Sequence, residues 1–303
     1  MLLLLALLLA EDPKAAKAEE KPAAPPVENL ADRFTDPALR TLIGEILTQK
    51  SRSADPITAD DLKTIFFLRG GDRGIASLAG LELCPNLSLV ELPGNAITDA
   101  TPLADRPRLQ SVDLSGNAIT SSDPFGTLPR LQYLNLAENE LDSLDGLKTA
   151  AALRSLDIAG NGVTALDPLA DCRQLQSLWA AGNALTSLDP LKDLPYLDTL
   201  DVAGNTLTSL DPLKGRSRLR MLLIAGNELG SLAPLVQTAE GEPLFLQLYV
   251  DQAQSSRLEG ELASLRDRSV RVEIVAAPSA SSDEPAGDRT PSEAADSPET
   301  PAN

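Results

Sequence analysis

Acidic side chains recur in this chain at a spacing that could support chemistry. One position of a 22-residue period holds four acids, an amide and an indole, namely Glu91, Asp113, Asn135, Asp157, Trp179 and Asp201. If successive positions lie on adjacent strands, about 4.8 Å apart, Glu91 and Asp113 could share a Ca²⁺ ion. Two carboxylates roughly 5–10 Å apart could also hydrolyse a glycosidic bond.

We nevertheless expect no metal site, no cofactor and no enzymatic activity. Ca²⁺ takes about six to eight oxygen ligands, and the positions flanking these acids are mostly Ser and Ala. A glycosidase needs a deep pocket, which an open repeat surface does not provide. The chain contains no histidine, which removes Ser-His-Asp and Cys-His nucleophiles and His-ligated zinc. The glycine-rich stretch 70–74 lacks the lysine and the Ser/Thr of a phosphate-binding loop.

The two cysteines also predict no covalent link. Cys84 and Cys172 are 88 residues apart, which is four periods of 22. On stacked strands that spacing places them about 19 Å apart, whereas a disulfide needs Cα atoms within about 7 Å. We therefore expect two free thiols, whatever the redox state of the compartment.

An internal repeat positions all of these residues. Seven asparagines follow one another at intervals of 22 residues: Asn95, Asn117, Asn139, Asn161, Asn183, Asn205 and Asn227. Around them runs the pattern Leu-x-x-Leu-x-Leu-x-x-Asn-x-Leu, which is that of a leucine-rich repeat. Its alternating part predicts short parallel strands that stack and share one leucine core. Each Asn amide should satisfy backbone groups at the turn, in its own repeat and in the neighbouring one.

The repeat array needs a cover at its N-terminal end, because terminal repeats of a solenoid otherwise expose their core. A degenerate eighth repeat, with Arg73 at the Asn position, extends the array to residues 65–239. Ahead of it, residues 30–64 predict a helical cap that contains a capping box at Thr58 and Asp61.

At the other end, residues 240–276 predict a strand–helix–strand cap. Its helix is expected over Ser256–Arg268 and its last strand over Val270–Val275. The fold class is therefore α/β: a leucine-rich repeat solenoid with a curved parallel sheet, about eight 22-residue repeats and a cap at each end.

The repeats also resemble those of a known family. Their 22-residue length is shared by listerial internalins and the protein-phosphatase-1 regulatory subunit, and segment 57–87 (ITADDLKTIFFLRGGDRGIASLAGLELCPNL) looks like the start of bacterial internalin-like proteins. The resemblance covers roughly residues 30–276 and implies protein–protein interaction. It names no partner, because such families keep a scaffold and vary what it binds.

Residues that alternate with the strand leucines should form the outward, concave face of the sheet, the usual binding surface of such proteins. Trp179, the only tryptophan, is predicted to point there among small neighbours, as an interface anchor does. We expect a partner to contact Trp179, Tyr133, Glu91, Asp113, Asn135, Asp157 and Asp201. Two alternatives stay open: the acids form only a solvated face, and Trp179 lies flat across its neighbours and shields the sheet.

Charge and the chain ends bear on partners and location. With 26 Lys+Arg against 44 Asp+Glu, the net charge is −18, which argues against nucleic acid and favours a basic protein partner. Residues 1–10 resemble the apolar core of a signal peptide, without a preceding cationic residue, and are too few to span a bilayer. Residues 11–29 are predicted to be a disordered spacer and 277–303, with six acids and one base, a disordered acidic tail.

Together these features predict a monomeric, exported protein–protein interaction module, secreted or held in the cell envelope, with no membrane span. A cytoplasmic regulatory adaptor, which the phosphatase-subunit resemblance suggests, remains an alternative. So does an envelope spacer without a specific ligand.

Overall fold

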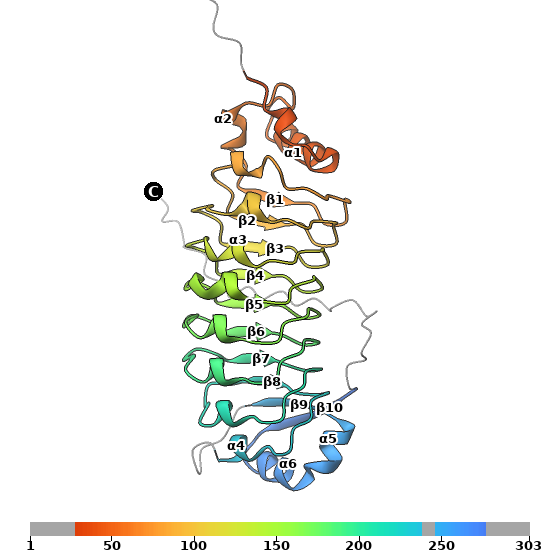
Figure 1. Cartoon of the computed structure of the whole chain (residues 1–303), viewed down its shortest axis with the longest axis vertical. Helices are drawn as coiled ribbons and strands as arrows, with labels where there is room; N and C mark the ends of the chain where they lie inside the picture. Colours follow the sequence, from red (N-terminus) through yellow and green to blue (C-terminus); the bar gives the residue numbers. More distant parts are fainter. Residues whose placement is uncertain (1–27, 238–245, 277–303) are drawn as a thin grey trace, which may run out of the picture.

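A single parallel sheet runs the length of the repeat array (Figure 1). The computed structural model describes residues 28–237 and 246–276, so the predictions for residues 1–10, 277–303 and most of 11–29 lie outside the described residues. The sheet has ten strands in sequence order. They are β1 (Phe67–Arg69), β2 (Leu89–Glu91), β3 (Ser111–Asp113), β4 (Tyr133–Asn135), β5 (Ser155–Asp157), β6 (Ser177–Trp179), β7 (Thr199–Asp201), β8 (Met221–Leu223), β9 (Gln247–Asp251) and β10 (Arg271–Val275).

The register confirms the repeat period. From β1 to β8 each strand residue pairs with the residue 22 positions later, as Leu134 of β4 does with Leu156 of β5. The middle residue of every one of these strands is buried, and the residues on either side of it are exposed or half-buried, except Asp157 and Asp201. The predicted α/β leucine-rich repeat solenoid is therefore the observed fold.

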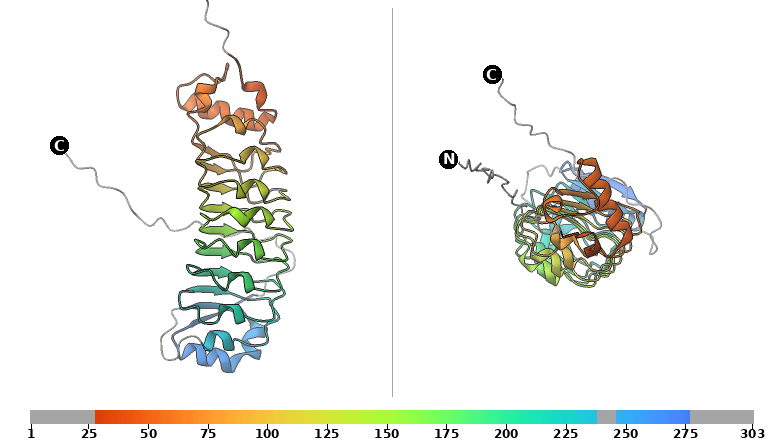
Figure 2. Two further views of the ribbon diagram at one scale, coloured as in Figure 1. Left: turned by 60° about the vertical axis from the view of Figure 1, so that its left-hand side comes forward. Right: turned by 90° about the horizontal axis from the view of Figure 1, so that it is seen from above.

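Short helices form the second layer, opposite the sheet (Figure 2). Four of the eight are single turns that begin where an Asp-Pro or Thr-Pro pair follows a buried leucine or alanine, since proline suits the first turn of a helix. The eight helices are η2 (Leu81–Leu83), η3 (Thr101–Leu103), α3 (Asp123–Gly126), η4 (Asp145–Thr149), η5 (Asp167–Leu169), η6 (Asp189–Leu191), η7 (Asp211–Leu213) and α4 (Ala233–Val236). Fully buried leucines from every repeat fill the space between the layers as one continuous core.

The asparagines form the predicted ladder. Asn161 shows the arrangement: its Oδ1 accepts from the N–H of Leu141 at 3.0 Å, and its Nδ2 donates to the carbonyls of Leu136, Ile158 and Ala159 at 2.9–3.3 Å. Leu136 and Leu141 belong to the preceding repeat. Each amide therefore closes its own turn and also joins it to the repeat before.

The N-terminal cap is held to the first repeat by a buried carboxylate. Asp36 precedes α1 (Pro37–Gln49) and accepts there from Ala38 and Leu39, while its second oxygen accepts from Ala76 and Ser77 of the first repeat. Burial alone would raise the pKa of Asp36, but these four N–H groups hold that pKa below its usual value. The cap also contains η1 (Ala31–Arg33) and α2 (Ala59–Leu62), and α2 begins with the predicted capping box.

The C-terminal cap continues the ladder with a different side chain. Gln254, almost fully buried, donates from Nε2 to the carbonyls of Ile224 and Asn227, in the turn that follows β8 of the last repeat. It belongs to α5 (Gln252–Arg257), and α6 (Glu259–Arg266) follows before β10.

The prediction of one helix over Ser256–Arg268 was wrong: the helical region starts earlier and is divided into two helices. A capping box between Asp251 and Gln254 starts the helical region at Gln252, directly after β9. A break at Leu258, whose side chain is buried, then separates α5 from α6. In the described residues no helix is long and apolar enough to cross a membrane.

The ladder predicts a large cost for a small substitution. Asn161→Ala leaves several backbone groups unpaired inside the turn and should lower the free energy of unfolding by about 1–3 kcal/mol. Leu156→Ala should cost about 2–5 kcal/mol through the cavity it leaves. Denaturant midpoints measure both. The matched control is Asn86→Ala, since this half-buried asparagine makes one bond, to the carbonyl of Lys63, and should cost at most about 1 kcal/mol. A wild-type midpoint for Asn161→Ala would contradict the role given to the ladder.

Both thiols should be inert in the native state. Cys84 and Cys172 are free and fully buried. Burial raises the pKa of Cys84 to about 12 and that of Cys172 to about 11. Because the thiolate is the reactive form, neither should be alkylated at pH 8 until the chain is unfolded, when both should react. Mass spectrometry of iodoacetamide-treated protein, native and denatured, counts the modified cysteines.

Candidate binding face

The structure places the seven predicted site residues on one face of the sheet. Six of them follow one another directly in register at the ends of β2 to β7, in the order Glu91, Asp113, Asn135, Asp157, Trp179, Asp201. Tyr133 begins β4 and so lies in the column at the strand starts. Beyond the strand ends runs a third column of small residues, of which Ala137, Ala159, Ala203 and Ala225 are buried. We call the surface formed by these three columns the strand face.

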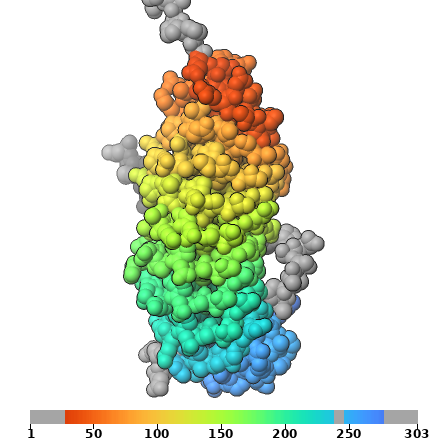
Figure 3. Space-filling model, viewed as in Figure 1, coloured from red at the N-terminus to blue at the C-terminus, as the bar shows by residue number. Residues whose placement is uncertain are grey.

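Trp179 and Tyr133 lie on the face of the sheet that the strand alternation predicts. Trp179 and Tyr133 are both half-buried on the strand face. Trp179 stands between Asp157 and Asp201 in the register. The repeats stack into one continuous, elongated surface between the two caps (Figure 3). Exposed indole surface above small neighbours is therefore available at the middle of the array.

Two of the acids are much less accessible than direct contact with a partner requires. Asp157 is 5% exposed and Asp201 is 4% exposed, whereas Asp113 is half-buried. The buried pair are the two register neighbours of Trp179, the bulkiest side chain in the column. Their carboxylates are shielded on the strand face, a feature that the strand alternation alone does not reveal.

These polar residues instead complete the turn that ends each strand. Oδ1 of Asp113, Asn135, Asp157 or Asp201 accepts from the backbone N–H two residues later, in each case at 3.0 Å. This is the local bond that makes Asp and Asn common in turns. An amide serves as well as a carboxylate, because Asn135 makes the same bond as its neighbours.

The remaining acid of the column is paired. Arg69 donates from Nε to Oε2 of Glu91 at 2.7 Å, and both side chains are well exposed. An exposed pair of this kind adds little to stability. It does reduce the negative charge that Glu91 presents to a partner.

Tyr133 sits in a polar but partly desolvated setting. Burial, together with the carboxylates of Asp113 and Asp157, raises the pKa of Tyr133 to about 12. The next residue in the same column is Ser155, whose shielded hydroxyl has no hydrogen-bond partner among the described residues. Tyr133 is therefore a neutral phenol that offers both an apolar ring and a hydroxyl to a partner.

Sequence reasoning missed the most exposed aromatic of the strand face. Phe67, the first residue of β1, is 60% exposed, and the adjacent Phe66 is 38% exposed. Phe67 starts the column that contains Tyr133, followed by the half-buried Leu89. The same column reading that selected Tyr133 could have found it. Within the described part of the chain, no group of three or more His, Cys, Asp or Glu side chains is placed to hold a metal ion.

The turn bonds predict different changes in stability for two substitutions at one position. Asp157→Ala removes the acceptor for the N–H of Ala159 inside a buried turn and should cost about 1–3 kcal/mol. Asp157→Asn keeps an oxygen there, as Asn135 does, and should change stability by less than about 0.5 kcal/mol. Chemical denaturation of both variants measures this difference. Equal losses would show that the charge of Asp157, and not its turn bond, holds this part of the structure.

Comparison with known proteins gives the following matches. The family model described as leucine-rich repeats (2 copies) matches residues 107–149 and 173–215. Among solved structures, internalin C2 from Listeria monocytogenes is similar at 28% identity and a TM-score of 0.68, over 73% of this chain and 96% of that one. Internalin F from the same organism matches at 20% identity and a TM-score of 0.41, over 84% and 94% of the two chains. The functional domain of its InlJ matches at 20% identity and 0.45, over 82% and 61%. No curated protein sequence matches this chain.

Proposed function

Because this chain is an internalin-like bacterial leucine-rich repeat protein, we propose that it is an exported module that binds a protein partner on its strand face. The outward-facing, half-buried position of Trp179 is the observation that carries this proposal. It is the only tryptophan, it is half-buried on an outward face, and nothing in the strand pattern requires an aromatic there. Tryptophan and tyrosine are the residues that most often anchor protein interfaces.

The contacts favour an aromatic rather than an electrostatic anchor. Asp157 and Asp201 are buried and bonded to their own turns, and Glu91 is paired with Arg69. Phe67 adds a second exposed ring towards the N-terminal cap. We therefore propose that the rings of Phe67, Tyr133 and Trp179 bind the partner. The net charge of −18 acts at longer range and favours a partner of basic character.

Export is the second half of the proposal. Its support is the signal-like apolar segment at residues 1–10 and the likeness to a bacterial internalin. N-terminal sequencing of the protein from its native cells tests it. A mature chain that begins shortly after residue 10 supports export, and an intact N-terminus on a cytoplasmic protein favours a regulatory adaptor instead.

Binding is tested by substitution on the strand face. With a partner captured from native cells and then purified, Trp179→Ala should weaken binding by at least about 2 kcal/mol, which is roughly 30-fold in Kd. Phe67→Ala should weaken it as well if the contact extends to β1. Isothermal titration calorimetry measures each affinity.

The matched control is another exposed aromatic residue outside the strand face. Tyr196 is 41% exposed on the loop before β7, and Tyr196→Ala should leave the Kd unchanged. If Tyr196→Ala abolishes binding while Trp179→Ala has no effect, the partner docks on the other side of the solenoid and the proposal is wrong.

A further inference from the structure

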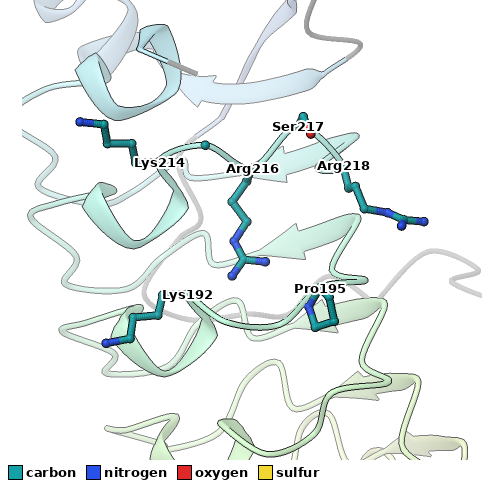
Figure 4. A pocket seen from close by; sticks show the side chains of 7 residues that line it. Lys192, Pro195, Lys214, Arg216, Ser217 and Arg218 are labelled. Carbon is teal, nitrogen blue, oxygen red and sulfur yellow. The ribbon is translucent and has the colours of Figure 1, made fainter. Parts of the chain in front are cut away.

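A cluster of cations lies away from the strand face, on the loops that lead from the helix layer back to the sheet. The loops before β7 and β8 enclose a shallow cavity of about 290 Å³ between two successive repeats. Its walls include Lys192 and Pro195 from one loop and Lys214, Arg216, Ser217 and Arg218 from the next (Figure 4). We call Lys192, Lys214, Arg216 and Arg218 the basic strip.

The cavity lies beside an arginine that occupies a core position of the repeat. Arg216 occupies the position of Cys172 and Leu194 in the two preceding repeats, and both of those side chains are fully buried. Its guanidinium instead donates to the carbonyls of Leu191 and Leu194 in the preceding repeat. These bonds fix a charge in the groove between the repeats. Arg106 holds the same position five repeats earlier and likewise donates to a carbonyl of its preceding repeat, that of Glu82.

Basic residues are concentrated in this part of the chain. Lys214–Arg220 contains four bases and no acid, in a chain with a net charge of −18. Among the described residues none of the four cations of the strip forms an ion pair. Burial lowers the pKa of Arg216, and the charge of Asp193 acts on that pKa in the opposite direction.

The arrangement of the strip suits an extended ligand. Lys192 and Lys214 extend towards one end of the cavity and Arg218 towards the other, with Arg216 between them (Figure 4). Arg218 also stacks on the exposed ring of Tyr196, 5.3 Å from its centroid. The cations do not converge on one point, as the binding of a single ion would require. They are spread across both loops, which fits a chain segment that carries several spaced carboxylates.

We infer that the basic strip binds the chain's own acidic segment, residues 277–303. That segment has six acids and one base, so its charge is complementary to the strip. It begins directly beyond β10, which lies two strands from β8 in the sheet. Fully extended it spans up to about 90 Å, far more than the few strands that separate its start from the strip.

Tethering favours this occupant over an acidic partner. A segment joined to the same chain is present at an effective concentration of about 1 mM or more. A separate acidic protein must instead approach a molecule whose net charge is −18, and the mutual repulsion slows such an encounter. The inference concerns a different surface from the strand face and does not depend on the proposed function.

Amine labelling of the full-length protein tests the inference. A variant in which the six acids become amides (Asp283→Asn, Glu284→Gln, Asp288→Asn, Glu293→Gln, Asp296→Asn and Glu299→Gln) keeps the segment but removes its charge. At low salt, Lys192 and Lys214 should be acetylated about threefold or more faster in this variant than in the wild type, as expected when a state populated at about two-thirds is lost. Peptide mass spectrometry measures the rate at each lysine. In about 1 M salt, where the Debye length is about 3 Å, the two proteins should react alike.

Two controls make the result specific. Lys148 occupies the same repeat position two repeats before Lys192, and Lys50 lies in the N-terminal cap; both should react at equal rates in the two proteins. Arg216→Leu restores the residue type of the preceding repeat, so the solenoid should fold, and it should speed acetylation of Lys192 without any change in the acidic segment. Equal rates at Lys192 and Lys214 in wild type and amide variant would overturn the inference. So would an equal acceleration at all four lysines.

Discussion

The structure depends on one constraint: at every turn out of the sheet, backbone groups are removed from water and must be hydrogen-bonded. An unpaired buried peptide group costs about 1–3 kcal/mol, and the array repeats the same turn throughout. Asparagine meets the constraint because its amide both accepts and donates. Asn161, for example, accepts from Leu141 and donates to Leu136 of the preceding repeat, and to Ile158 of its own. The ladder therefore joins neighbouring repeats as well as closing each turn.

The caps obey the same constraint at the two ends. Gln254 supplies the amide that the next repeat would have provided, and Asp36 supplies carboxylate oxygens to the first repeat. With the turns and the core satisfied internally, the outward positions of the strands are free to vary. Binding residues can then be exchanged on the strand face without loss of fold. Trp179 is such a position, whereas Asp157 and Asp201, although they stand beside it, are used by their own turns.

The regularity of the repeat determines which features of the structure could be predicted from the sequence. A fixed period sets the strand register, so the columns, the core leucines, the ladder and the separation of Cys84 from Cys172 all follow from spacing. Features that depend on the size of a neighbouring side chain do not follow from the spacing. The burial of Asp157 beside Trp179 is one example. The entry of Arg216 into a core position is visible in the alignment of the repeats, but the carbonyls that it bonds belong to the preceding repeat and come only from the fold. Helix α5 starts earlier than predicted because its capping box belongs to the end of β9.

The central claim is that the strand face around Trp179 is the surface that a partner covers. Since Trp179 is the only tryptophan, its fluorescence reports on this surface alone, and a hydroxytryptophan incorporated there can be excited separately from the partner. The decisive measurement is acrylamide quenching of this residue, free and saturated with the purified partner. The account predicts a quenching constant several-fold lower in the complex, together with a blue-shifted emission. An unchanged constant in a saturated complex would contradict it.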